Sequence, residues 1–237
     1  MNIEISLEDL LKNGSHFGHN KKRWNPKMNK FIYGEKNGTH VIDLRKSLPL
    51  IENALKFAHE SSKNKKKFLF VSTKKQHSEI VENIAKETNN YFVNFRWLGG
   101  MITNWNTVKN SINTLNNYEN ILNSEDTVFT KKELSDIEKK KIRLDKTLGG
   151  IVEMKSTPDV IFIIDTNREH IAVLEAKKLG IPIIGIVDTN CDPDLIDYPI
   201  PANDDGVKSV QFILDNFKKV LVSGEDTSSV ESTTKNE

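Results

Sequence analysis

Residues 158–187 read PDVIFIIDTNREHIAVLEAKKLGIPIIGIV, and this stretch decides the fold class. The apolar runs 160–164 and 181–187 are typical of strands that are buried on both faces of a sheet. Between them, residues 168–179 have the apolar spacing of an amphipathic helix. A strand, a helix and a second strand in this order form the repeating unit of a parallel sheet.

The same alternation extends toward both ends of the chain. Helices are predicted at 44–62, 76–88 and 207–222, and strands at 68–71 and 91–95. Repeated units of this kind predict an α/β fold with a doubly wound parallel sheet. 

The N-terminal region adds smaller elements to this sheet. A short amphipathic helix is predicted over 3–13. The β-like runs 31–33 and 39–43 flank Asn37-Gly38, a pair that readily adopts the positive φ angles of a tight turn. The sequence therefore predicts an N-terminal β-hairpin.

Residues 103–148 interrupt the alternation with two amphipathic helices. Thr130 and Glu133 form a capping box at the start of the second helix, and Lys141 breaks its apolar seam. We interpret this insertion as an antiparallel helical (coiled-coil) hairpin that projects from the α/β domain. The domain itself then comprises 1–102 and 149–222, and the polar tail 223–237 is predicted to be disordered.

The amino-acid composition excludes several classes of protein. The 237 residues contain no apolar run near the roughly 20 residues that span a bilayer, so a soluble, cytoplasmic protein is expected. The single cysteine, Cys191, excludes an internal disulfide and is predicted to be a small buried thiol. The net charge of +1 does not itself indicate a nucleic-acid partner. The charges are uneven, however, because 21–36 is rich in lysine and arginine whereas acids gather at 188–205.

A search for catalytic groups at the strand ends finds little. Neither a phosphate-binding G-x-x-x-x-G-K-[ST] loop nor a G-x-G-x-x-G fingerprint is present. A nucleotide-dependent enzyme that uses Thr73, Asp165 and Asp188 stays open as an alternative. The aspartates of 188–205 are the residues that turns and helix caps need, although clustered carboxylates can also bind Mg²⁺. His16 and His19 have metal-ligand spacing, but no second pair completes a site, so we predict no metal or cofactor.

Two segments combine cations with aromatic rings. In 16–28, lysines and an arginine alternate with His and Trp, a mixture suited to phosphates and to stacking on unpaired bases. Residues 96–105 have a similar character. The alternatives are that 16–28 is a solvated loop with Trp24 covering the core, and that Trp97 and Trp105 pack the base of the helical hairpin. The predicted RNA-binding residues are His16, His19, Lys21, Lys22, Arg23, Trp24, Asn25, Lys27, Arg96, Trp97, Asn104, Trp105 and Lys109.

Several segments, in the same order along the chain, resemble one known family. They are GSHFGH at 14–19, WNPKM at 24–28, HVIDL at 40–44, RWLGG at 96–100 with Thr103-Asn104, VDTNCDP at 187–193 and IPANDD at 200–205. They make nearly the whole chain similar to the bacterial-type small-subunit ribosomal protein numbered two. The chain departs from that family at Ser72, where glycine is usual, and in its tail.

The resemblance implies a flavodoxin-like domain with an inserted coiled coil. It also implies a structural role between the head and body of the small ribosomal subunit. The excess of lysine over arginine and the frequent asparagine fit a bacterial or an organelle-encoded gene. The implied partners are ribosomal RNA and neighbouring ribosomal proteins. The resemblance implies no membrane, small-molecule substrate or reaction.

Overall fold

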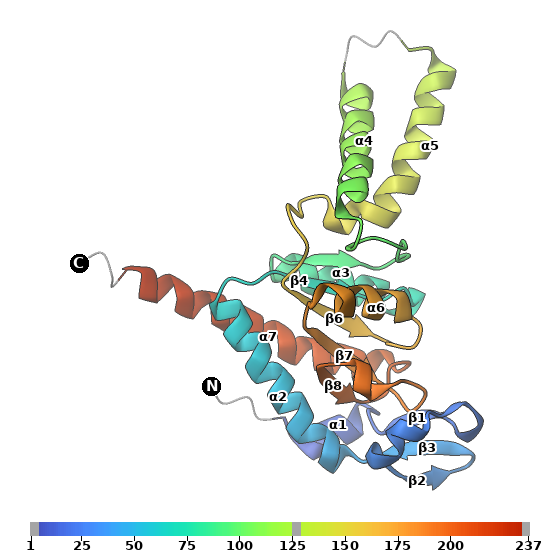
Figure 1. Cartoon of the computed structure of the whole chain (residues 1–237), viewed down its shortest axis with the longest axis vertical. Coiled ribbons are helices and arrows are strands. Elements are labelled where there is room, and N and C mark those ends of the chain that lie inside the picture. The colour runs from blue at the N-terminus through green and yellow to red at the C-terminus, as the bar shows by residue number, and fades with distance from the viewer. Residues whose placement is uncertain (1–4, 125–128, 234–237) are drawn as a thin grey trace.

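The centre of the molecule is a five-stranded parallel sheet in the order β5-β4-β6-β7-β8 (Figure 1). The computed structural model describes residues 5–124 and 129–233, and side chains as far as 224. The strands are β4 (Phe68–Val71), β5 (Tyr91–Val93), β6 (Val160–Ile164), β7 (Ile183–Val187) and β8 (Tyr198–Pro201). In order of sequence this is the 2-1-3-4-5 arrangement of flavodoxin-like folds. The predicted fold class is confirmed.

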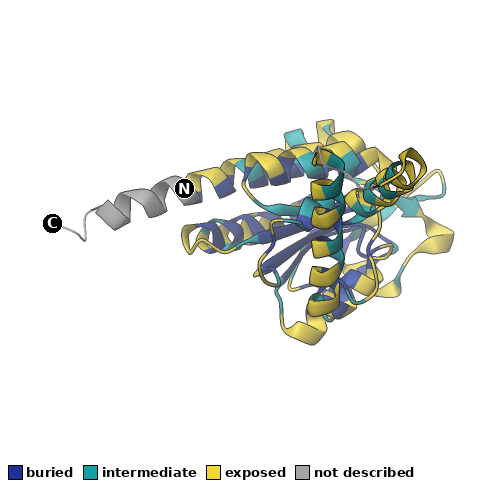
Figure 2. Ribbon diagram, turned by 90° about the horizontal axis from the view of Figure 1, so that it is seen from above, coloured by how far each residue is buried: buried dark blue, intermediate teal, exposed yellow. Residues whose placement is uncertain are grey.

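Helices cover both faces of the sheet, which encloses two hydrophobic cores. α2 (Leu44–Lys63), α3 (Ser78–Glu87) and α7 (Val207–Thr233) pack on one face. α6 (His170–Leu179) and the base of the helical hairpin pack on the other. Within β4, Phe70 points into the first core and Leu69 into the second, because successive side chains alternate across a strand. Figure 2 shows the resulting buried layer along the strands.

The N-terminal region forms a separate antiparallel sheet in the order β1-β3-β2. It consists of β1 (Phe17–Asn20), β2 (Ile32–Lys36) and β3 (Thr39–Ile42), and α1 (Leu7–Lys12) precedes it. The hairpin of β2 and β3 was predicted, and its turn residues Asn37 and Gly38 have φ of 53° and 78°. β1 was not predicted, because half-exposed residues at a sheet edge show no apolar alternation.

The predicted helical hairpin consists of α4 (Trp105–Asn123) and α5 (Lys131–Leu148), which stand clear of the sheet (Figure 1). The capping box of Thr130 and Glu133 is present at the start of α5. Lys141 is accommodated in the seam because its Nζ lies 2.9 Å from Glu119 Oε1 on α4.

α7 extends to Thr233 and so includes residues 223–233 of the tail that was predicted to be disordered; no proline occurs there to interrupt the helical hydrogen bonds. The disorder of the tail stays a prediction. Residues 234–237 lie outside the described part. The remaining elements are short 3-10 helices at Lys21–Arg23, Pro26–Phe31, Lys75–His77, Gly149–Ile151 and Pro193–Leu195. Within the described ranges, no helix has the length and apolar character required to cross a bilayer.

Candidate nucleic-acid interface

The backbone of the first predicted RNA-binding segment, residues 16–28, is held in a defined path. The Asn20 side chain accepts a hydrogen bond from Lys22 N at 2.9 Å, and the Asn25 side chain accepts one from Lys27 N at 3.0 Å. These side chains cap the two 3-10 helices that follow β1. Met28 is fully buried in the second core and anchors the end of the segment. The segment therefore has a defined backbone path, and most of its side chains from 20 to 27 are exposed.

The four cations of this segment are all exposed, but they differ in their partners. Lys21 Nζ lies 2.8 Å from Glu35 Oε1, and Lys27 Nζ lies 2.7 Å from Asp192 Oδ2. Lys22 and Arg23 have no ion-pair partner among the described side chains, which belong to residues 5–124 and 129–224. These two side chains are available to an external anion.

Aromatic rings lie beside these cations. Trp24 is 38% exposed and packs edge-on against His40, with ring centroids 5.3 Å apart, so it does not close the core. Phe17 is 53% exposed and lies against His16, with centroids 4.0 Å apart. Burial, followed by the charge of Lys36, lowers the pKa of His16, which favours the neutral ring. Phe17 was missed as a surface residue because its sequence gave no sign that it begins an edge strand.

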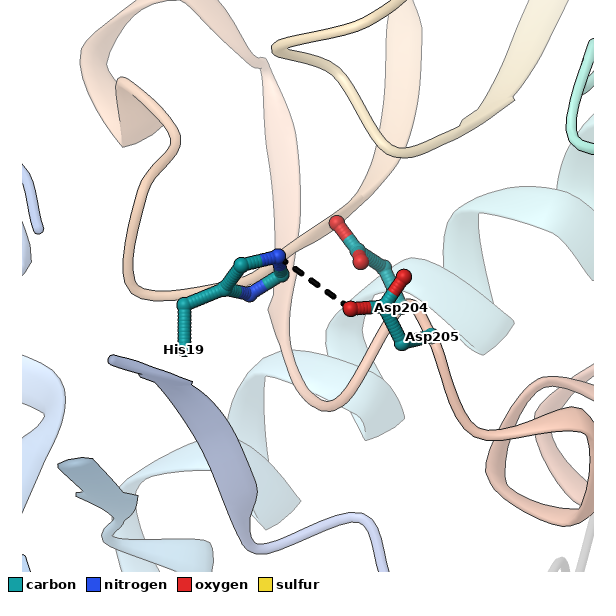
Figure 3. Close-up of side chains that lie close together, drawn as sticks. All are labelled: His19, Asp204 and Asp205. Atoms are coloured by element: carbon teal, nitrogen blue, oxygen red, sulfur yellow. Dashed lines mark ion pairs between the residues drawn. The ribbon is translucent and has the colours of Figure 1, made fainter. Parts of the chain in front are cut away.

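The His19 side chain is directed toward the carboxylates at the strand ends of the large sheet. Its Nδ1 lies 3.0 Å from Asp188 Oδ2 and its Nε2 lies 3.2 Å from Asp205 Oδ2. Figure 3 shows the imidazole directed toward Asp204 and Asp205 at the strand ends. The hydrogen bond to Asp188 is the main cause that raises the pKa of His19 to about 9. His19 therefore anchors β1 to the large sheet, and its RNA contact stays a prediction.

Asp165, one of the candidate catalytic groups at the strand ends, is paired with Lys74. Lys74 Nζ lies 2.7 Å from Asp165 Oδ2, 2.8 Å from Asp204 Oδ1 and 2.8 Å from Asp205 Oδ1. Burial alone would lower the pKa of Lys74, but the carboxylates of Asp204, Asp165 and Asp205 raise it above its usual value. Burial, with Asp165 and Asp188 nearby, raises the pKa of Asp204 to about 7.

Aspartate and asparagine side chains at the strand ends also fix turns. Asp165 Oδ1 accepts from Arg168 N at 3.0 Å, and Asp192 Oδ1 accepts from Asp194 N at 3.1 Å. Asn203 Oδ1 accepts from Gly206 N at 3.0 Å. These bonds hold the connections after β6, β7 and β8 in place.

The sequence did not predict one further arrangement, because its members are far apart along the chain. His19, Asp204 and Asp205 bring ligand atoms within 4.8 Å of one another, as do Asp165, Cys191 and Asp204. Such oxygen, nitrogen and sulfur donors could hold a divalent cation. Lys74 competes with that use, since its ammonium already contacts three of these carboxylates.

The thiol of Cys191 is buried, as predicted, and burial raises its pKa to about 12. A protonated, inaccessible thiol is not a nucleophile at neutral pH.

The second predicted segment is only partly on the surface. Arg96, Asn104 and Lys109 are exposed. Trp97 is 7% exposed, and its Nε1 donates to Glu175 Oε1 at 3.1 Å, so little of its ring is open to a base and its RNA contact stays a prediction. Trp105 is half-buried against the second core. Both rings pack the base of the helical hairpin, which is the alternative that the sequence left open. In Figure 1 this segment, beside α4, lies far from β1, so the two predicted segments do not form one patch.

Comparison with known proteins identifies the family. The family model described as "Ribosomal protein S2" matches residues 10–224. A protein of Wolbachia pipientis named "Small ribosomal subunit protein uS2" is 52% identical, with 99% of this chain and 87% of that protein covered. Proteins of the same name from Brucella ovis and Mesorhizobium japonicum are each 48% identical over 93% of this chain, and 87% and 85% of their own lengths are covered. The chain belongs to the ribosomal protein S2 family, whose members are structural ribosomal proteins and not enzymes.

Proposed function

We propose that this protein binds small-subunit ribosomal RNA between the head and body of the subunit and supports translation there. The observation that carries the proposal is the surface of Lys22, Arg23 and Trp24, which we call the Lys22 surface. It places two cations, which have no ion-pair partner among the described side chains, directly before an indole that is 38% exposed. No small-molecule substrate or cofactor is needed for this role.

The chemistry of the Lys22 surface favours RNA over other anionic partners. Lysine and arginine neutralise phosphates, and the release of counterions from RNA supplies much of the binding free energy. An indole face stacks on an unpaired base, which single-stranded loops of folded RNA provide. The caps from Asn20 and Asn25 fix the backbone before binding, so little conformational entropy is lost when RNA docks.

A second contact is proposed at the foot of the helical hairpin. There, Arg96, Asn104 and Lys109 are exposed and offer donors to phosphates and to base edges. The separation of this foot from the Lys22 surface suits an RNA with two distant contact points (Figure 1). Neighbouring ribosomal proteins would then occupy the remaining faces. The compartment proposed is the bacterial cytoplasm, where ribosomes work.

Sedimentation of native cell extracts tests the role. The tagged full-length chain is expected to migrate with small ribosomal subunits, and to do so less when Lys22→Gln and Arg23→Gln are combined. Lys178→Gln with Lys208→Gln removes the same charge from exposed positions on α6 and α7 and should leave migration unchanged. Recovery of the unmodified chain only in the free protein fractions would overturn the proposal.

A further inference from the structure

Glu175, on α6, is a buried carboxylate that the Lys22 surface does not use. It is 8% exposed, and no ion pair within the described residues involves it. Its Oε1 accepts from Trp97 Nε1 at 3.1 Å and from Gly100 N at 2.7 Å. Its Oε2 accepts from Ile102 N at 3.2 Å, from Thr103 N at 3.1 Å and from Thr103 Oγ1 at 3.0 Å. One side chain therefore receives five hydrogen bonds from one short segment.

These bonds keep Glu175 ionised. Burial alone would raise the pKa of Glu175, but donation from Trp97 and from the Thr103, Gly100 and Ile102 amides lowers it below the usual value. The segment 97–103 is neither helix nor strand, and Gly100 takes a φ of 85° within it. The carboxylate thus replaces the partners that regular secondary structure would give to these backbone donors.

The segment held by Glu175 joins two exposed groups. Arg96 lies directly before Trp97, and Asn104 follows Thr103 at the start of α4. We propose that Glu175 is the positioning residue of this second contact, fixing Arg96 and Asn104 relative to each other before RNA arrives. The inference rests on the proposed function, since it concerns how the foot of the hairpin meets RNA.

A matched pair of substitutions separates positioning from general stabilisation. Glu175→Gln keeps the volume, but an amide has a single acceptor oxygen, so some of the donors lose their partner. Glu169 is a suitable control because it lies on the same side of the fold, is 4% exposed, and accepts from Thr73 N at 2.9 Å instead of from the RNA-facing segment. Glu169→Gln makes the same chemical change away from Arg96.

The experiment is a double-mutant cycle in which the affinity of each full-length variant for small-subunit ribosomal RNA is measured. The temperature is chosen so that circular dichroism shows every variant to be folded. Glu175→Gln should weaken binding about tenfold, the equivalent of about 1.4 kcal/mol. Arg96→Gln should then have little further effect in the Glu175→Gln background, because coupled residues are not additive. Lys22→Gln should combine additively with Glu175→Gln, and Arg96→Gln should combine additively with Glu169→Gln.

Each outcome decides the inference. Additive effects of Glu175→Gln and Arg96→Gln, or unchanged affinity in Glu175→Gln, would overturn it. If Glu175→Gln does not fold, Glu175→Asp is used in its place, because aspartate keeps the negative charge on a shorter side chain. Its coupling energy to Arg96 should have the same sign and a smaller magnitude. Failure of the unmodified chain to bind this RNA would instead reject the proposed function.

Discussion

Nδ1 of His19 lies 3.0 Å from Oδ2 of Asp188, and this contact joins the small N-terminal sheet to the carboxyl end of β7. The backbone N of His19 also donates to Thr189 Oγ1 at 2.9 Å. Residue 18 must be a glycine for this contact to form, because a Cβ on it would lie only 2.6 Å from Thr189 Cγ2. The junction therefore fixes the position of β1, at the start of the 16–28 segment, relative to the large sheet.

The junction makes stability depend on pH. The pKa of His19 is about 9 in the folded chain and 6.5 without partners, so its stabilisation is complete below pH 6.5 and is lost as pH rises through 9. The free energy of unfolding should therefore fall by about 2 kcal/mol between pH 6.5 and pH 9, after allowing for partial solvent screening. A metal chelator is added so that no cation binds His19 in place of a proton.

Urea unfolding at successive pH values measures this dependence. In His19→Gln the fall should be clearly smaller, whereas His170→Gln, at an exposed position, should behave like the unmodified chain. Equal pH dependence in all three proteins would contradict the role given to His19.

Removing the free cations of the Lys22 surface should alter the salt dependence of RNA binding. Lys22→Gln with Arg23→Gln should lower the slope of log affinity against log salt by about two, one for each phosphate contact. Filter binding between low and physiological salt measures the slope. Lys178→Gln with Lys208→Gln provides the control, and a slope that responds equally to both pairs would show that only overall charge matters.

Gly150 should not tolerate a side chain. A Cβ at this position would overlap the carbonyl oxygen and ring of Phe92, so the turn after α5 could no longer pack against β5. Gly150→Ala should lower the free energy of unfolding by about 2 kcal/mol or more. Gly99→Ala, where nothing lies within 4 Å of the added Cβ, should change it by less than about 0.5 kcal/mol. Similar urea midpoints for the two variants would contradict this packing.

Cys191 should resist alkylation. Its burial and its pKa of about 12 predict that iodoacetamide at pH 8 modifies the folded chain at least about 100-fold more slowly than the chain in urea. Mass spectrometry at successive times measures both rates. Rapid modification without denaturant would mean that the strand-end region opens readily.

The large sheet was readable from the sequence wherever a strand is buried on both faces. β4, β6 and β7 are entirely buried, and each is an apolar run. β8 was missed because its two prolines, Pro199 and Pro201, cannot donate to a ladder and are tolerated only at the edge that this strand occupies. Local patterns thus identified the interior of the sheet better than its borders.

The site was predictable only where it depends on neighbours in sequence. The cations of 21–27 are exposed, as their local pattern suggested. The orientation of Trp97 depends on Glu175, which is 78 positions away, and that of His19 depends on Asp188. A ring that stacks on RNA and one that donates to a buried carboxylate look alike in sequence, because the deciding partner is placed by the fold.

The helical hairpin leaves the sheet after β5, an edge strand, and returns before β6. Its two feet, Trp105 and Leu148, meet in the same hydrophobic core. Seven residues added to each arm would therefore shift the distal end by about 10.5 Å and leave every strand pairing as it is. The length of the helical hairpin can therefore change during evolution without any change in the α/β domain from which it projects.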